Sequence, residues 1–130
     1  HDWRHTAIGS LCEIIVLDQF SRNIYRGQAG AFRQDPLALA LAQTAIDKGF
    51  DKQLNETEVG FMYLPFMHSE SAKIHELAMT LYKDHPSYEF EVAHKAIIDQ
   101  FGRYPHRNAI LGRKSSEQEL TFLTQPNSSF

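Results

Sequence analysis

SAKIHELAMTLYK, residues 71–83, decides the fold class. Its apolar side chains recur at the three- and four-residue spacing that places them on one face of an α-helix, and its charged side chains fall on the other face. The apolar positions are Ile74, Leu77, Ala78, Leu81 and Tyr82. Similar spacing recurs in nearly every other segment, whereas the alternation typical of strands does not extend over five or more residues. The sequence therefore predicts an all-α fold.

Start and stop signals divide the chain into roughly six or seven helices. Asn55 and Ser116 each stand three residues before a glutamate, which is the capping-box pattern of a helix N-terminus. Pro65 interrupts the helix that follows Asn55 and predicts a kink or a stop near His68. The helix over about residues 6–25 is apolar nearly all round, so we expect it to be the most buried element. Short loops and a weak repeat of about 36 residues favour stacked antiparallel helix hairpins.

The helix between Ser87 and Gly102 is predicted to bury one stripe and expose another. The expected buried stripe consists of Phe90, Ala93, Ile97, Ile98 and Phe101. The expected solvated face carries charges of alternating sign at four-residue spacing, on Glu91, Lys95 and Asp99. His94 lies on the apolar side and is predicted to be a core residue.

Composition excludes several classes of protein. The 130 residues suffice for one core, so we expect a single helical domain over residues 1–130. Cys12 is the one cysteine, which favours a reducing, cytoplasmic compartment and a small core side chain there. No apolar stretch approaches the ~20 residues of a membrane span. A net charge of -3 and aromatic residues at core-facing spacing argue against a nucleic-acid partner.

No cofactor or metal site is predicted. His75 and Glu76 begin like the zinc-peptidase helix motif, but Met79 stands where the second histidine is needed. The chain also lacks a cysteine pair, an EF-hand spacing and a Walker-type loop.

The basic side chains are unevenly distributed. Residues 19–34 and 100–116 contain no acid and hold seven basic side chains, which are Arg22, Arg26, Arg33, Arg103, Arg107, Arg113 and Lys114. Six basic side chains are left to face all 16 acidic ones in the rest of the chain. Because arginine makes planar, bidentate contacts with carboxylate and phosphate, this segregation indicates an anion-binding surface. The alternative is that these arginines tie loops to helix ends and acidic helices.

Acids and histidines near these arginines are the candidate catalytic groups. Asp18 precedes Arg22 by one turn on an apolar helix, so it is expected to be partly buried and paired with an arginine. His68 and Glu70 follow Pro65, where a helix end can present both to a groove. His106 stands near Arg103 and Arg107, whose like charge disfavours its protonated form.

Four segments carry a resemblance to a known family: LDQFSRNIYRG (17–27), DPLAL (35–39), YLPFMHSE (63–70) and FGRYPHRNAILGR (101–113). Together they resemble family 924 of the domains of unknown function, which are mainly bacterial proteins, over about residues 3–123. The resemblance implies a tetratricopeptide-like right-handed superhelix and a further helical stretch before Trp3. Ser21 stands where the family has proline. The family's motif positions fall on Asp18, Arg22, Asn23, Arg26, His68, Glu70, Arg103, His106, Arg107, Asn108 and Arg113.

These observations leave three hypotheses of function. The first is a binding module that clamps an anionic small molecule or peptide, using Arg22, Asn23, Arg26, Arg103, Arg107, Asn108 and Arg113. The second is a hydrolase-type enzyme that uses Glu70 or Asp18 as general base with His68 or His106 as acid. The third is a structural polar network without a ligand. Neither the ligand nor the oligomeric state follows from the sequence.

Overall fold

The computed structural model describes residues 2–130, and every regular element among them is helical, as predicted. The longer helices are α1 (Ala7–Ile15), α3 (Asp35–Asp47), α4 (Glu56–His68), α5 (Ala72–Leu81), α6 (Tyr88–Phe101) and α8 (Glu117–Leu123). The short α-helices are α2 (Ser21–Ile24) and α7 (Asn108–Leu111). The 3-10 segments are η1 (Asp2–His5), η3 (Ala29–Phe32), η4 (Phe50–Gln53) and η5 (Pro105–Arg107), and η2 (Val16–Phe20) is a π-helix.

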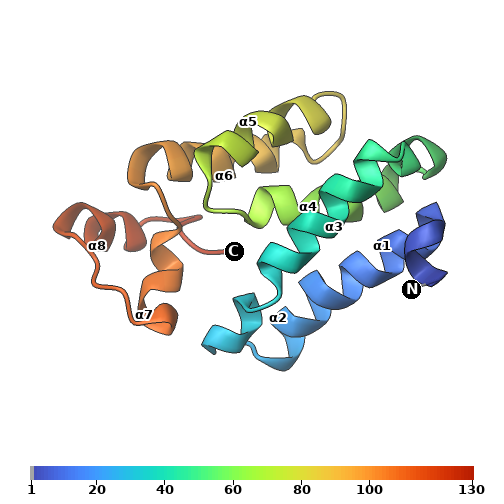
Figure 1. Cartoon of the computed structure of the whole chain (residues 1–130). Helices are drawn as coiled ribbons and strands as arrows, with labels where there is room; N and C mark the ends of the chain where they lie inside the picture. Colours follow the sequence, from blue (N-terminus) through green and yellow to red (C-terminus); the bar gives the residue numbers. More distant parts are fainter. Residues whose placement is uncertain (1) are drawn as a thin grey trace.

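Neighbouring helices in the chain pack against one another (Figure 1). Helix α1 lies along α3, α3 packs on α4, and α5 packs on both α4 and α6. Helices α7 and α8 lie at one end, and the last residues return toward the middle of the molecule (Figure 1). The tetratricopeptide-like superhelix stays a prediction.

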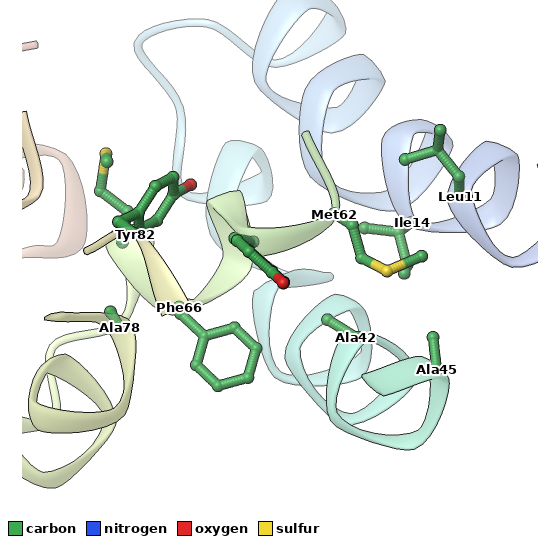
Figure 2. Close-up of a cluster of buried hydrophobic side chains, with 10 residues drawn as sticks. Leu11, Ile14, Ala42, Ala45, Met62, Phe66, Ala78 and Tyr82 are labelled. Atoms are coloured by element: carbon green, nitrogen blue, oxygen red, sulfur yellow. The ribbon is translucent and has the colours of Figure 1, made fainter. Parts of the chain in front are cut away.

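The main hydrophobic core joins these helices, as Figure 2 shows. Leu11 and Ile14 from α1 approach Met62 of α4, beside the small side chains of α3 (Figure 2). Ala42 and Ala45 are buried there, and their size lets α3 approach its neighbours closely. A smaller core cluster of Ile97, Ile98 and Tyr104 anchors the C-terminal third.

Local signals place the helix ends as predicted. Asn55 and Glu58 exchange two 2.9 Å hydrogen bonds at the start of α4, and Ser116 with Glu119 forms the second capping box, at α8. Helix α4 continues through Pro65 and stops at His68.

Two expectations about burial are wrong. The first helix is not the most buried element, because α1 packs on α3 and α4, and η2 on α3, with one face left uncovered. This face exposes Ile8, Cys12, Val16, Phe20 and Ile24, so the cysteine is not a core residue.

Within the described residues, no helix has both the length and the apolar character needed to cross a bilayer.

Helix α6 is rotated relative to its predicted orientation. Phe90 and Ala93 of the expected buried stripe are exposed, whereas Glu91 of the expected solvated face is completely buried. Ile97, Ile98 and His94 are buried as predicted. The inward position of Glu91 is explained by His75 of α5, whose Nδ1 lies 2.7 Å from the Glu91 carboxylate.

Candidate functional site

A cavity of about 340 Å³ lies where α2, η3, α4, α6 and η5 meet the last residue of the chain. Its wall combines two guanidinium groups, three imidazoles and several aromatic rings. These side chains include Arg22, Arg107, His68, His94, His106 and Phe130. The arrangement therefore unites residues from both arginine-rich windows in one hollow.

Arg107 is the most unusual member of this wall. It ends η5, a 3-10 turn that begins at Pro105, and its side chain is only 5% exposed. The guanidinium carbon lies 4.4 Å from the centre of the Phe32 ring and 4.8 Å from that of Tyr104, so the two rings hold it in place. Its Nη2 donates to the backbone carbonyl of His68 at 3.0 Å, but its buried Nε has no partner. Burial and the nearby charge of Arg22 lower the pKa of Arg107.

Among the described residues, the ion pairs include none for Arg107. The other guanidinium of the cavity wall, that of the partly buried Arg22, is paired with acids. Arg22 makes two hydrogen bonds of 2.8 and 2.9 Å with Asp35, at the start of α3, and a third of 3.1 Å with Asp18. Among the described residues, Arg107 is thus a buried cation whose direct contacts are one carbonyl and two aromatic faces, while the charges of Asp35 and Glu70 act on it without forming an ion pair.

Asp18 lies behind the cavity wall, in the π-helix η2, and is 1% exposed. Its Oδ1 lies 2.8 Å from Nδ1 of His68, a residue that lines the cavity. Burial alone would raise the pKa of Asp18, but the His68 hydrogen bond and the charge of Arg22 lower it below its usual value. The prediction that Asp18 is buried and paired with an arginine is confirmed.

The other two histidines of the cavity are neutral at physiological pH. Burial lowers the pKa of His106 to about 4, with the charge of Arg107 acting in the same direction. Burial likewise lowers the pKa of His94 to about 4, although its Nδ1 bonds to the Phe90 carbonyl at 2.6 Å. Like charge does act on His106 as predicted, but burial is the larger cause. Both rings also contact the ring of Phe130.

The remaining predicted site residues lie outside this cavity. Arg103 makes hydrogen bonds of 2.7 and 2.8 Å with the carboxylate of Glu119. Arg113 makes bonds of 2.9 and 3.0 Å with Glu70, whose carboxylate also accepts from the backbone N–H of Tyr104 at 2.7 Å. These pairs attach the C-terminal loops to the segment between α4 and α5 and to α8.

The two predicted asparagines and Arg26 are also elsewhere. Asn108 is buried; it accepts from Arg113 Nε and donates to Ser115 Oγ. Asn23 and Arg26 are exposed and bond to each other at 3.2 Å. The structure therefore gathers Arg22, His68, His106 and Arg107, with Asp18 behind them, and leaves Asn23, Arg26, Glu70, Arg103, Asn108 and Arg113 outside the cavity.

Sequence reasoning missed the aromatic part of the site. Phe32 and Phe130 line the cavity, and Phe90 does so from its exposed position on α6. The exposure of Phe90 depends on the rotation of α6, and this rotation cannot be predicted from the local sequence pattern. No group of three metal-ligating side chains occurs in the part of the chain that the structure describes.

Comparison with known proteins finds relatives of unknown function. The chain matches the family described as bacterial protein of unknown function, DUF924, over residues 1–127. It is also similar to the solved structure of a protein of unknown function from Agrobacterium tumefaciens, with a TM-score of 0.89 and 38% identity. That match covers 94% of this chain and 70% of the other. None of the curated proteins matches.

Proposed function

We propose that this chain, which belongs to the DUF924 family of bacterial proteins, is a binding module that holds one anionic group against Arg107. The observation that carries the proposal is the state of this guanidinium: it is 5% exposed, faces a cavity, and has no acidic partner among the described residues. Burying a charge is costly unless another charge or hydrogen bonds compensate it. A ligand carboxylate or phosphate in the cavity would supply that compensation.

The proposed clamp is smaller than the set of arginines selected from the sequence. Arg22 lines the same cavity and adds positive potential, although its hydrogen bonds already reach Asp18 and Asp35. Arg103 and Arg113 have no part in it, because their guanidinium groups are bound by Glu119 and Glu70. These two ion pairs join protein side chains to one another, as the third hypothesis, a structural polar network without a ligand, predicts.

Replacement of Arg107 tests the proposal directly. We expect the wild-type protein to bind acetate and inorganic phosphate, and Arg107→Met to bind them about 10- to 100-fold more weakly, because a charged hydrogen bond is lost. The unfolding free energy should change by only about 1–2 kcal/mol, since the guanidinium has no ion pair to break and methionine fills the space between the two rings. Affinity is measured by NMR titration of backbone amides, and stability by urea unfolding.

Arg26→Met provides the matched control. Arg26 is exposed and bonds only to Asn23, so this variant removes the same formal charge without touching the cavity. Equal anion binding by Arg107→Met and wild type, or equal losses in both variants, would show that no specific clamp exists at Arg107.

One hydrogen-bonded pair of side chains, Asp18 and His68, favours the hydrolase alternative. The buried Asp18 carboxylate accepts from Nδ1 of His68, which leaves Nε2 as the nitrogen that can take a proton from water beside a ligand held by Arg107. Glu70 does not belong to this pair, since it is bound to Arg113. For an active wild-type protein, we expect His68→Gln to lower hydrolysis of ester or phosphoester substrates at least 100-fold, with anion binding retained. Hydrolysis that survives this replacement, or its absence from the wild type, contradicts the enzyme hypothesis.

A further inference from the structure

We infer that the ligand is a monocarboxylate with an extended apolar tail, whose carboxylate meets Arg107 and whose tail lies along Phe90 and Phe130. This inference rests on the proposed anion-binding function and specifies the ligand of the same site. It follows from three features of the site: the charge balance of the cavity, a second hollow beside it, and the residues that line this second hollow.

The charge balance favours a single negative charge. Two guanidinium groups line the cavity, but the positive charge of Arg22 is already shared with Asp18 and Asp35. Arg107 alone is left to be compensated, and a carboxylate carries one charge in a planar form that matches a guanidinium. A phosphate monoester would bring close to two negative charges at neutral pH, and the described cavity wall holds no further cation without an ion pair to compensate the second.

A second hollow of about 410 Å³ adjoins the cavity at Phe90, His94 and Phe130. These three residues line both spaces, so the two are adjacent and share a wall. Each volume is within the range of small-molecule sites, and a ligand that occupied both would have to be elongated. A third hollow of about 290 Å³ shares Phe32, His68 and Arg107 with the cavity, and Asp35 and Glu70 also line it.

The far hollow suits an uncharged tail. Pro86, Ala93 and Ile97 line it together with the two phenylalanines, and its one charged side chain is Glu89. An acidic residue there opposes a second anionic group on the ligand, whereas a hydrocarbon chain only needs apolar contact. Between the two ends lie His94 and His106, which burial keeps neutral at physiological pH, so no fixed positive charge interrupts the path.

Phe90 is an aromatic side chain that folding leaves largely exposed. It is 65% exposed at the first turns of α6, although its position on the apolar stripe predicted burial. Because it lines both spaces from an exposed position, covering it with a ligand tail would bury apolar surface that folding leaves in water.

The test is a chain-length series with the full chain. We expect the affinity for acetate, butyrate, hexanoate and octanoate to rise two- to fourfold per added methylene, as is typical of apolar burial, so that octanoate binds at least about 60-fold more tightly than acetate. 1-Octanol should bind at least tenfold more weakly than octanoate, because it lacks the charge. Intermolecular nuclear Overhauser contacts should connect the terminal methyl of octanoate to the rings of Phe90 and Phe130.

Phe90→Ala should abolish most of the chain-length dependence, so that octanoate binds this variant only a few-fold more tightly than acetate does. Phe61→Ala is the matched control, because Phe61 is also exposed but lines neither of the two spaces. If acetate binds and the longer acids bind no better, the ligand class is wrong while the anion site stands. If octanol binds as well as octanoate, the carboxylate assignment is wrong. If inorganic phosphate binds and no carboxylate does, the inference falls and the anion site stands; if neither binds, both the inference and the binding function fall.

Discussion

Acidification from pH 6.5 to 4 is expected to remove several kcal/mol of unfolding free energy, mainly through two histidines of the cavity wall. Burial lowers the pKa of both His94 and His106 from 6.5 to about 4. In this pH window the folded state therefore binds fewer protons than the unfolded state. The stability that depends on the neutral rings is complete above pH 6.5 and is lost as the pH falls through 4.

The size of the effect follows from the shifts. One pKa unit corresponds to about 1.4 kcal/mol, so each ring contributes about 2 kcal/mol of lost stability at pH 5 and about 3 kcal/mol at pH 4. Both rings contact Phe130, so protonation of either one places a charge against an aromatic ring in a poorly hydrated site. Urea unfolding followed by circular dichroism at pH 4, 5, 6 and 7 measures the loss.

His94→Phe isolates one of the two contributions. A phenyl ring keeps the packing against Phe130 and Tyr104 and cannot be protonated, although it loses the bond to the Phe90 carbonyl. We expect a cost of about 1 kcal/mol at pH 7 and a smaller loss than wild type between pH 7 and pH 4. If the unfolding free energies of the two proteins fall equally between pH 7 and pH 4, protonation of His94 does not destabilise the folded state.

Glu91→Ala is expected to lower the unfolding free energy by about 3 kcal/mol. Glu91 and His75 are both completely buried, and the Glu91 carboxyl lies 2.7 Å from His75 Nδ1. On its other side, His75 Nε2 lies 2.6 Å from the Ser69 carbonyl, an acceptor, so Nε2 carries the proton. Alanine would leave Nδ1 buried without a partner and would create a small cavity.

Glu91→Gln should cost less than about 1 kcal/mol. When Nε2 of a neutral His75 carries the ring proton, Nδ1 accepts, so the carboxylic acid of Glu91 donates this hydrogen bond. Burial acts in favour of this protonated form, because it raises the pKa of Glu91. A glutamine amide donates in the same direction and has almost the same shape. The matched control is Glu89→Ala, an exposed residue of the same helix, for which we expect about 0.5 kcal/mol or less. A glutamine variant as unstable as the alanine variant would show that the pair is ionised rather than neutral.

Part of the site was predictable because it depends on neighbours in the chain. Asp18 and Arg22 are one helical turn apart on an apolar helix, so their pairing follows from helix geometry. The partner of Arg107 could not be predicted in the same way. Its aromatic contacts come from Phe32, 75 residues earlier, and from Tyr104, and its lack of an acid depends on where every carboxylate of the fold lies.

The sequence by itself determined the all-α class, the capped starts of α4 and α8 and the end of α4, because periodicity and caps act within one or two turns. Only the tertiary structure decided which face of each helix is buried where two patterns compete. Helix α6 turns Glu91 inward and Phe90 outward because His75 of α5 provides a buried hydrogen-bond partner. The tertiary structure also separated the arginines bound by protein carboxylates from Arg107, the one that is buried without an acidic partner among the described residues. That division depends on side chains brought together from distant parts of the chain. Such contacts cannot be predicted from sequence patterns that extend over only one or two helical turns.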